Sequence, residues 1–354
     1  MRAPWLYYSD SFLQHETAGH PESPQRLLTT LKQLDESGIK RHLQLRTPGP
    51  VDRGLLERLH HPRYLAEVEA FCQSAGSGRR IDEDTIASRG SYAAALDAAG
   101  AAVAMTEALL GDACDTAFSL VRPPGHHAMP QHTMGFCFFN NVALAALYAL
   151  ERGGLERVAI LDWDAHHGNG TEHIFYRDPR VLFVSWHQDP NWPGTGKLED
   201  IGEGPGKGYN LNIPLPVNYG DAAFLRSYEA LVAPALERFK PQLILVSAGY
   251  DAHHADILTQ MGLTATGFAQ LTEAVMQTAE RQCRGKAGFL LEGGYHVQAL
   301  ANSVTATLAT LLQQQAAPFA ERLGPPPAVE TLALEVLIEK IRRIQPLLQK
   351  EEGP

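Results

Sequence analysis

The sequence lacks several features that would each point to a particular class of protein. Its 354 residues include only four cysteines, which lie far apart and form no CxxC pair. Neither a disulfide framework nor a thiolate metal site is therefore predicted, and the cysteines are expected to be reduced core thiols. No dense run of lysine or arginine occurs, and the formal net charge is −10. This charge argues against nucleic-acid binding through phosphate neutralisation and slightly favours cationic substrates.

Long hydrophobic runs are also scarce. The first residues, MRAPWLYYSDSF, lack the apolar core of a signal peptide, and no run looks long enough to span a bilayer. We therefore expect a soluble, cytoplasmic protein without a membrane partner. Apolar residues make up 44% of the chain, which is enough for a large buried core, and the length suits one large domain or two ordinary ones.

Short apolar runs that alternate with helical patterns predict a mostly parallel sheet with helices on both faces. These unbroken runs are typical of strands buried on both sides, and they cover residues 158–161, 181–186, 243–249 and 288–294. Helices are predicted at residues 90–110, 141–152, 221–239 and 266–281.

The tail of the chain has a different composition. The segment GPPPAVE at residues 324–330 breaks the pattern before an amphipathic helix that we expect at 332–348. We therefore predict one α/β domain over residues 1–323 and a C-terminal appendage over 324–354. Its helix is expected to dock on the main domain or on a partner, and it is a candidate contact in a homo-oligomer.

Carboxylates and an imidazole follow two of the predicted strands. Asp164 and His166 form a D-x-H pair after one strand, and Asp251 follows another. A D-x-H pair alone is more typical of a helix cap or a surface turn. The second aspartate at a matching strand end favours a metal site, because ligands bind where parallel strands end. Oxygen and nitrogen ligands suit zinc, and three of them leave a position open for water and substrate.

Two adjacent histidines, His126 and His127, follow the stiff sequence RPPG. Adjacent loop histidines are more often surface polar groups. Their functional interpretation is a general base and acid, because a histidine with a near-neutral pKa can accept and return a proton. Such histidines need acceptors that fix their tautomers, and Asp162 and Asn169 are available beside the metal candidates.

Three aromatic residues have both a structural and a functional interpretation. Tyr295 follows two glycines and is either an ordinary core residue or a hydroxyl donor to a carbonyl oxygen on which negative charge develops. Phe136 and Trp192 lie in the loops GFCFF and NWPGTG. They either pack these loops or form two walls of a narrow slot that grips an aliphatic chain.

Five segments of the chain together resemble one known family. RPPGHHA, GFCFFNN, DWDAHHGNGT, VSAGYDAHH and LEGGY closely resemble the zinc-dependent histone deacetylase superfamily, especially its class II branch and the bacterial histone-deacetylase-like and acetylpolyamine amidohydrolases. The similarity runs from His20 to about Ala309. It implies an arginase/deacetylase-like α/β fold and zinc-dependent hydrolysis of an N-acetyl amide to acetate and amine. Acetyl-lysine side chains are the expected substrate, and acetylated polyamines or other small amides are the alternative.

The resemblance also implies roles for individual residues. The zinc ligands would be Asp164, His166 and Asp251; the proton-transfer pair His126 and His127, with His127 the general base; their partners Asp162 and Asn169; and the oxyanion donor Tyr295. The substrate would contact Phe136 and Trp192 as tunnel walls, Gly135 as backbone acceptor and Asp84 at the rim. A K⁺ site would use Asp162, Asp164 and Ser185 with backbone oxygens near His166 and Trp186. Asn169 stands where class I relatives usually carry aspartate, which favours class II.

The loop after Asp251 departs from the family pattern. It reads AHHADILTQMG, where many relatives have a proline and glycines. The shape of the rim and the choice of substrate are therefore open, and Asp84, Asp189 and Asp256 are candidate rim carboxylates.

Two other functions fit the same fold. A binuclear manganese ureohydrolase would need a D-x-D pair where this chain has the single carboxylate of Asp251. A non-catalytic acyl-binding module would be favoured by loss of Tyr295 or of a metal ligand, and neither is lost.

Overall fold

The structure of the chain is a computed structural model that describes residues 2–313, 323 and 332–349. In this part, eight strands form one central sheet in the order β2-β1-β5-β10-β9-β6-β7-β8, and every neighbouring pair is parallel. Its strands are β1 (Trp5–Tyr7), β2 (Gln44–Arg46), β5 (Thr116–Ser119), β6 (Val158–Asp162), β7 (Val181–Gln188), β8 (Asn210–Leu215), β9 (Leu243–Ala248) and β10 (Ala287–Leu291). A small antiparallel ribbon joins β3 (Arg79–Arg80) to β4 (Ile86–Ala87).

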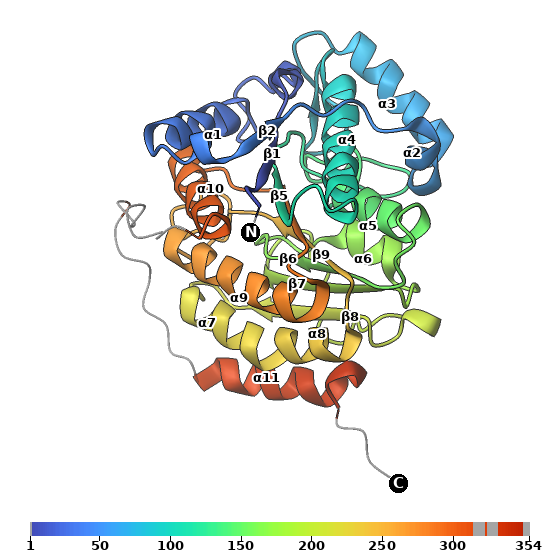
Figure 1. Cartoon of the computed structure of the whole chain (residues 1–354). Coiled ribbons are helices and arrows are strands. Elements are labelled where there is room, and N and C mark those ends of the chain that lie inside the picture. Colours follow the sequence, from blue (N-terminus) through green and yellow to red (C-terminus); the bar gives the residue numbers. More distant parts are fainter. Residues whose placement is uncertain (1, 314–322, 324–331, 350–354) are drawn as a thin grey trace.

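Helices cover both faces of the sheet, as the sequence predicts (Figure 1). They are α1 (Gln25–Glu36), α2 (Arg53–Leu59), α3 (Pro62–Ser74), α4 (Ser91–Leu110), α5 (Asn141–Glu151), α6 (Asn169–Phe175), α7 (Asp221–Ser227), α8 (Ala233–Phe239), α9 (Ala265–Cys283), α10 (Val297–Leu311) and α11 (Leu332–Ile344). Helices α1, α9 and α10 pack together, and α4 packs on α5 across the sheet from them. Strands β6, β7, β9 and β10 are buried along their whole length, which explains their unbroken apolar sequences.

Two predicted elements differ from the structure. The helix expected at 221–239 is divided by a π turn at Tyr228–Val232, just before Pro234. Proline has no N–H to donate to the carbonyl four residues earlier, so the regular ladder cannot continue there. The strand expected at 288–294 ends at Leu291, because the N–H of Gly293 donates to Asp164 Oδ2 instead of pairing in the sheet.

The C-terminal helix α11 docks on the main domain, which was one of the two locations that the sequence left open. It lies beneath α7 and α8 at the edge of the fold (Figure 1) and contacts the π turn at Tyr228–Val232 that joins them. Leu334, Ile338 and Ile341 are buried in this contact, and Gln345 donates to the backbone oxygen of Asn210 in the edge strand β8 at 2.7 Å. The expected break GPPPAVE at 324–330 lies outside the described residues.

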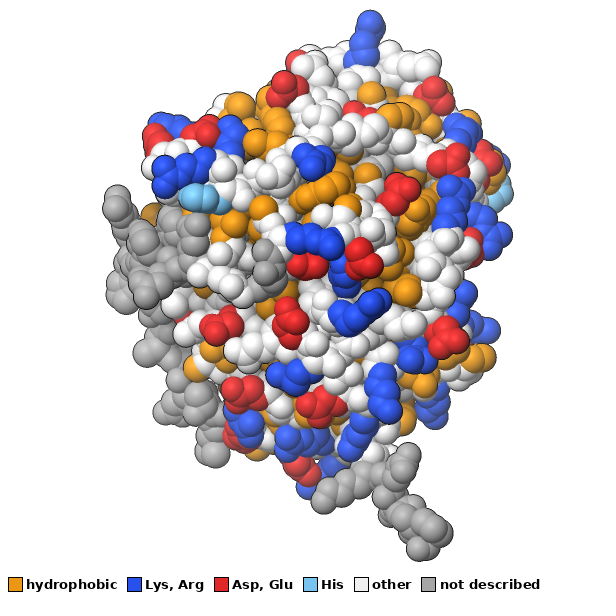
Figure 2. All heavy atoms as spheres, in the orientation of Figure 1, with side chains coloured by type: hydrophobic (Ala, Val, Ile, Leu, Met, Phe, Trp, Pro, Cys, Tyr) orange, Lys and Arg blue, Asp and Glu red, His pale blue; other side chains and the backbone are white. Residues whose placement is uncertain are grey.

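The surface charges, helix α4 and the cysteines bear on three further expectations. Acidic and basic side chains are interspersed on the face shown in Figure 2, in keeping with the lack of a basic run. Helix α4 is long and apolar enough to cross a membrane by length and composition alone, contrary to the expectation that no run reaches that length. However, 61% of its apolar window is buried inside the fold, as in a core helix. The four cysteines are buried and unpaired, as expected.

The order of the strands determines where the polar side chains meet. Strands β5, β10, β9 and β6 are neighbours in the sheet, and each is followed at its carboxyl end by one of the motifs identified in the sequence. RPPGHH follows β5, EGGY follows β10, GYDAHH follows β9 and DWDAHH spans the end of β6. The carboxyl ends of parallel strands share one edge, so residues more than a hundred positions apart converge there.

Candidate active site and metal centre

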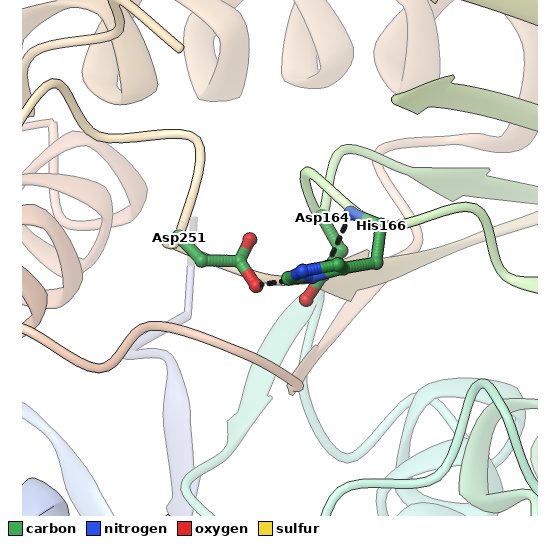
Figure 3. Close-up of side chains that lie close together, drawn as sticks. All are labelled: Asp164, His166 and Asp251. Carbon is green, nitrogen blue, oxygen red and sulfur yellow. Dashed lines mark hydrogen bonds and ion pairs between the residues drawn. The ribbon is translucent and has the colours of Figure 1, made fainter. Parts of the chain in front are cut away.

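Asp164, His166 and Asp251 form a compact cluster at this edge. One ligand atom from each lies within 4.8 Å of the others. His166 Nδ1 is 3.0 Å from Asp251 Oδ2 and 3.2 Å from Asp164 Oδ1, and the three side chains point toward one another (Figure 3). The remaining carboxylate oxygens accept backbone N–H groups: Asp251 Oδ1 from Ala165 at 2.8 Å and Asp164 Oδ2 from Gly293 at 2.8 Å. These bonds fix the direction of both carboxylates.

The surroundings of this cluster fit a small divalent cation. A Cβ atom at Gly293 would lie 2.2 Å from Asp251 Oδ2 and 2.6 Å from Asp164 Oδ2, so only glycine leaves space beside the carboxylates. Burial and the neighbouring charge of Asp164 raise the pKa of Asp251 to about 7. A bound cation would compensate this unfavourable pairing of buried carboxylates. Two carboxylates and one imidazole are a ligand set that zinc accepts.

His126 and His127 lie directly beside this cluster, with ring centroids 3.8 Å apart. His126 Nδ1 bonds to Asp162 Oδ2 at 2.9 Å, and His127 Nδ1 bonds to Asn169 Oδ1 at 2.7 Å. The structure thus brings each histidine to the partner that the sequence suggested. With Nδ1 engaged in each ring, Nε2 is the atom that is left for the cluster, and His126 Nε2 is 3.8 Å from Asp164 Oδ2.

The two histidines differ strongly in electrostatic environment. Burial disfavours the charged form of His126, but Asp162 and Asp164 outweigh it and raise its pKa to about 10. Burial and the nearby His126 and His166 hold the pKa of His127 well below its usual value, and its partner Asn169 carries no charge to oppose them. The geometry therefore favours a charged His126 beside a neutral His127, which is the form that can accept a proton.

Tyr295 is buried and close enough to the cluster to feel the charges of Asp251 and Asp164. It lies in the short connection between β10 and α10, and its ring meets the Phe136 ring edge-on with centroids 5.5 Å apart. The guanidinium carbon of Arg26 lies 5.1 Å from the centre of the Tyr295 ring. Burial raises the pKa of its phenol well above the usual value, so the hydroxyl keeps its proton and can donate it in a hydrogen bond.

Phe136 and Trp192 approach the cluster from two loops. Trp192 packs edge-on against the His127 ring at a centroid distance of 4.7 Å and is 41% exposed, so it joins the buried site to the surface. Gly135 lies between these groups with φ +57°. A Cβ there would lie 2.3 Å from the His127 ring and 2.7 Å from the Trp192 ring, so glycine is required at this position.

The three candidate rim carboxylates, Asp84, Asp189 and Asp256, differ in burial and in hydrogen bonding. Asp84 is half-buried, and its Oδ1 accepts the N–H of Gly135 at 3.2 Å, which puts it beside the loop of Phe136. Asp189 is exposed. Asp256 is partly buried, and its Oδ2 accepts the N–H groups of Tyr295 at 2.6 Å and His296 at 3.1 Å. The sequence motif could not reveal that this carboxylate bonds to the backbone.

The alternative of a second metal ion and the predicted K⁺ site both concern side chains at the carboxyl edge of the sheet. Within residues 2–313, 323 and 332–349, Asp164–His166–Asp251 is the one group that meets the geometric criteria for a metal, so a binuclear ureohydrolase site is not supported. Asp162 and Ser185 are paired neighbours on β6 and β7, which brings together two of the residues suggested for K⁺. Whether they bind that ion remains a prediction.

One buried carboxylate at the site was missed by the sequence analysis. Glu292 Oε2 accepts the N–H groups of Gly125 at 2.6 Å and His126 at 3.1 Å, and Oε1 accepts the hydroxyl of Ser247 at 3.1 Å. Burial raises the pKa of Glu292 to about 7. Glu292 thus holds the backbone of the histidine loop. Its position at the end of an apolar strand is a signal that could have identified it.

Comparison with known proteins gives the same family throughout. The histone deacetylase domain family matches residues 20–311. The chain is 45% identical over 279 residues to a histone deacetylase-like amidohydrolase of Pseudomonas aeruginosa, covering 78% of this chain and 73% of that protein. It is 36% identical over 317 residues to the human polyamine deacetylase HDAC10, covering 86% of this chain and 46% of that protein. The crystal structure of the HDA15 HD domain superposes with a TM-score of 0.87 at 30% identity, covering 97% of this chain and 94% of that one.

Proposed function

The chain belongs to the histone deacetylase family and is a deacetylase, and from this premise we propose that it hydrolyses N-acetyl amides at a zinc ion held by Asp164, His166 and Asp251. The observation that carries the proposal is the convergence of this cluster with two partnered histidines and a buried tyrosine at one edge of the sheet. The reaction adds water across the amide and releases acetate and an amine.

Each side chain has a task that follows from its position. When bound, a zinc ion would supply a Lewis acid for the attacking water and for the amide carbonyl. His127 Nε2 accepts the proton of the water, and the pair His126–His127 returns a proton to the departing amine. The Tyr295 hydroxyl donates to the carbonyl oxygen as its negative charge grows. Asp162 keeps His126 charged and oriented.

For the substrate, we propose acetyl-lysine side chains. Phe136 packs on Tyr295 and Trp192 packs on His127, and both rings would contact a slender methylene chain that reaches the cluster. A polyamine also carries a distal ammonium group, which must be paired or hydrated near the rim. Asp256 is already bonded to backbone N–H groups, and the residues that follow it, Ile257 and Leu258, are exposed and apolar. This loop therefore offers a distal ammonium no unengaged carboxylate, which favours acetyl-lysine over a polyamine.

Acetylpolyamines are the second candidate substrate. The 36% identity to a human protein named as a polyamine deacetylase favours it. Asp189, which is exposed and lies three positions before Trp192, would then be the carboxylate available to hold a distal ammonium.

The test is acetate release from acetyl-lysine peptides and from acetylpolyamines, with the purified protein before and after chelation. We expect turnover of the peptides, loss of turnover in the metal-free protein, and recovery when zinc is added back. Robust turnover of polyamines with none of any acyl-lysine peptide would overturn the substrate proposal. Turnover that is unaffected by thorough removal of metal would overturn zinc dependence.

Tyr295→Phe is expected to lower kcat by roughly 10²–10³-fold, the loss typical of removing one oxyanion donor. The substitution removes a hydroxyl and keeps the ring that packs on Phe136. Zinc content and melting temperature should therefore remain those of the wild type. If kcat stays unchanged while zinc is fully bound, Tyr295 is a packing residue.

Trp192→Ala is expected to raise KM on the order of tenfold, from the loss of an aromatic contact with the substrate chain. The contact is shared by the ground and transition states, so kcat should fall less than KM rises. Because Trp192 also packs on His127, Trp192→Phe is the matched control that keeps an aromatic wall. A fall in kcat with KM unchanged would instead indicate that Trp192 acts through His127.

A further inference from the structure

The Tyr295 loop gains its shape from contacts outside itself. Strand β10 ends at Leu291 and α10 begins at Val297, so Tyr295 lies in a five-residue connection that contains two glycines. Gly294 has φ +118°, a conformation that other residues rarely adopt. A connection of this kind has many alternative conformations, and something must select the one that turns the tyrosine toward the metal cluster.

The peptide unit between Gly294 and Tyr295 is held at both of its polar ends. Its carbonyl oxygen accepts a hydrogen bond from Arg26 Nε at 2.7 Å. Its N–H donates to Asp256 Oδ2 at 2.6 Å. A peptide unit is planar, so fixing both ends fixes its orientation, and with it ψ of Gly294 and φ of Tyr295. These two angles set the direction in which the Tyr295 side chain leaves the backbone.

The phenol itself has no comparable anchor. Among the residues that the structure describes, no group forms a hydrogen bond with the Tyr295 hydroxyl, and the ring is positioned by its contacts with Phe136 and Arg26. The orientation of the hydroxyl therefore depends on the backbone that carries it. The hydroxyl is therefore available to a substrate oxygen. Its direction depends on the two hydrogen bonds that hold the Gly294–Tyr295 peptide unit, which together we call the peptide clamp.

Asp256 also connects this clamp to the metal cluster. It lies five positions after Asp251, in a loop that is closed by the hydroxyl of Thr259, which donates to the backbone oxygen of Asp251. Its own N–H donates to the oxygen of His253 at 2.8 Å, and its Oδ1 accepts the N–H of Leu258 at 3.0 Å. The carboxylate is thus held in place by the loop that carries a metal ligand.

We propose that Asp256 is a positioning residue for Tyr295, whose carboxylate clamps the Gly294–Tyr295 peptide opposite Arg26 and so aims the phenol at the substrate carbonyl beside the metal cluster. The inference rests on the proposed function of Tyr295 as oxyanion donor. It assigns to the unusual loop after Asp251 a role in catalysis in place of a contact with the substrate.

A purely structural role is the alternative to be tested. Asp256 also bonds to the N–H of His296, the residue that caps α10, so it could serve only to stabilise the start of that helix. Asp221 offers a matched control, because its Oδ1 accepts the N–H of Thr264 at 2.9 Å at the start of α9. Both aspartates bond to backbone at the beginning of a helix, and Asp256 alone bonds to the amide of Tyr295.

The experiment is a double-mutant cycle in the zinc-loaded protein with an acetyl-lysine peptide, using Asp256→Ala, Asp256→Asn and Tyr295→Phe. We expect Asp256→Ala to lower kcat by about 10- to 100-fold, less than the roughly 10²–10³-fold that follows loss of the oxyanion donor itself, with KM and zinc content little changed. Asn keeps one acceptor oxygen, so Asp256→Asn should recover part of the loss. In the Tyr295→Phe background, Asp256→Ala should change kcat by less than about threefold, because the group that it orients is gone.

The outcomes separate the two proposals. Multiplicative losses in the double mutant, or a kcat loss no greater than that of Asp221→Asn, would overturn the positioning role. An unchanged kcat in Tyr295→Phe alone would overturn the proposed role of Tyr295 itself, whatever Asp256 does. If Asp256→Ala does not fold, Asp256→Asn completes the cycle with the same readings.

Discussion

Replacing Asp251 with asparagine is expected to abolish deacetylation and zinc binding together. The substitution keeps the size of the side chain but removes the negative charge beside His166 Nδ1 and Asp164. Changing a group that merely orients a ligand costs 10- to 100-fold in metal affinity, so losing one of three ligands should cost at least about 100-fold. Zinc content after dialysis and kcat/KM with an acetyl-lysine peptide are the measurements.

The effect of added zinc on the melting temperature distinguishes loss of the metal from misfolding. A ligand that binds only the folded state raises the melting temperature, so added zinc should stabilise the wild type and fail to stabilise Asp251→Asn. Asp221→Asn is the control, since Asp221 is an aspartate that bonds to backbone away from the metal cluster and should leave zinc binding intact. Full zinc occupancy and full turnover in Asp251→Asn would show that the ligand assignment is wrong.

The half of the fold that carries the metal cluster could be predicted from sequence because its strands are buried on both faces. Strands β6, β7 and β9 were predicted to within two residues, since a doubly covered strand must be apolar throughout. The polar residues directly after them then had to lie at one edge of the sheet. That logic applies to Asp164, His166 and Asp251 without any knowledge of the fold.

Strands β1, β2, β5 and β8 were not predicted, and for the first two the reason is physical. Strands β1 and β2 have three residues each, and β2 is an edge strand whose residues are exposed or only partly buried. Runs this short carry no usable periodicity. Helices α1 and α10, which cover that side, were likewise not predicted, although Arg26 on α1 reaches the Tyr295 loop.

The backbone contacts of the site were beyond the reach of sequence patterns. In the sequence, Asp256 is a carboxylate on a polar loop, which suggests a surface role. In the structure, its oxygens accept three backbone N–H groups. In the sequence, Glu292 only marks the end of a strand. In the structure, it accepts the backbone N–H groups of Gly125 and His126 and so fixes the loop of His126. Motifs record which side chains are present, whereas backbone hydrogen bonds depend on loop geometry that only the structure supplies.

The histidine pair is the second place where a large loss is expected. His127→Ala should lower kcat by roughly 10²–10⁴-fold, the usual contribution of a positioned general base. Burial and the neighbouring His126 and His166 hold the pKa of His127 low, so it is uncharged and ready to accept a proton, while Asn169 orients its ring. The exposed His132 on the same loop offers a matched control, and His132→Ala should keep wild-type turnover.

His126→Ala should also impair turnover severely, but through a different loss. His126 is held charged by Asp162 at 2.9 Å, so its removal takes a positive charge from beside the metal cluster and leaves Asp162 buried without its partner. The wild-type pH–rate profile should rise from acidic pH as the base loses its proton, and His127→Ala should flatten that limb. Near-silent substitutions at both positions would make the pair a structural feature of the loop. A loss at His127 alone would assign the whole proton transfer to that residue and leave His126 an electrostatic role.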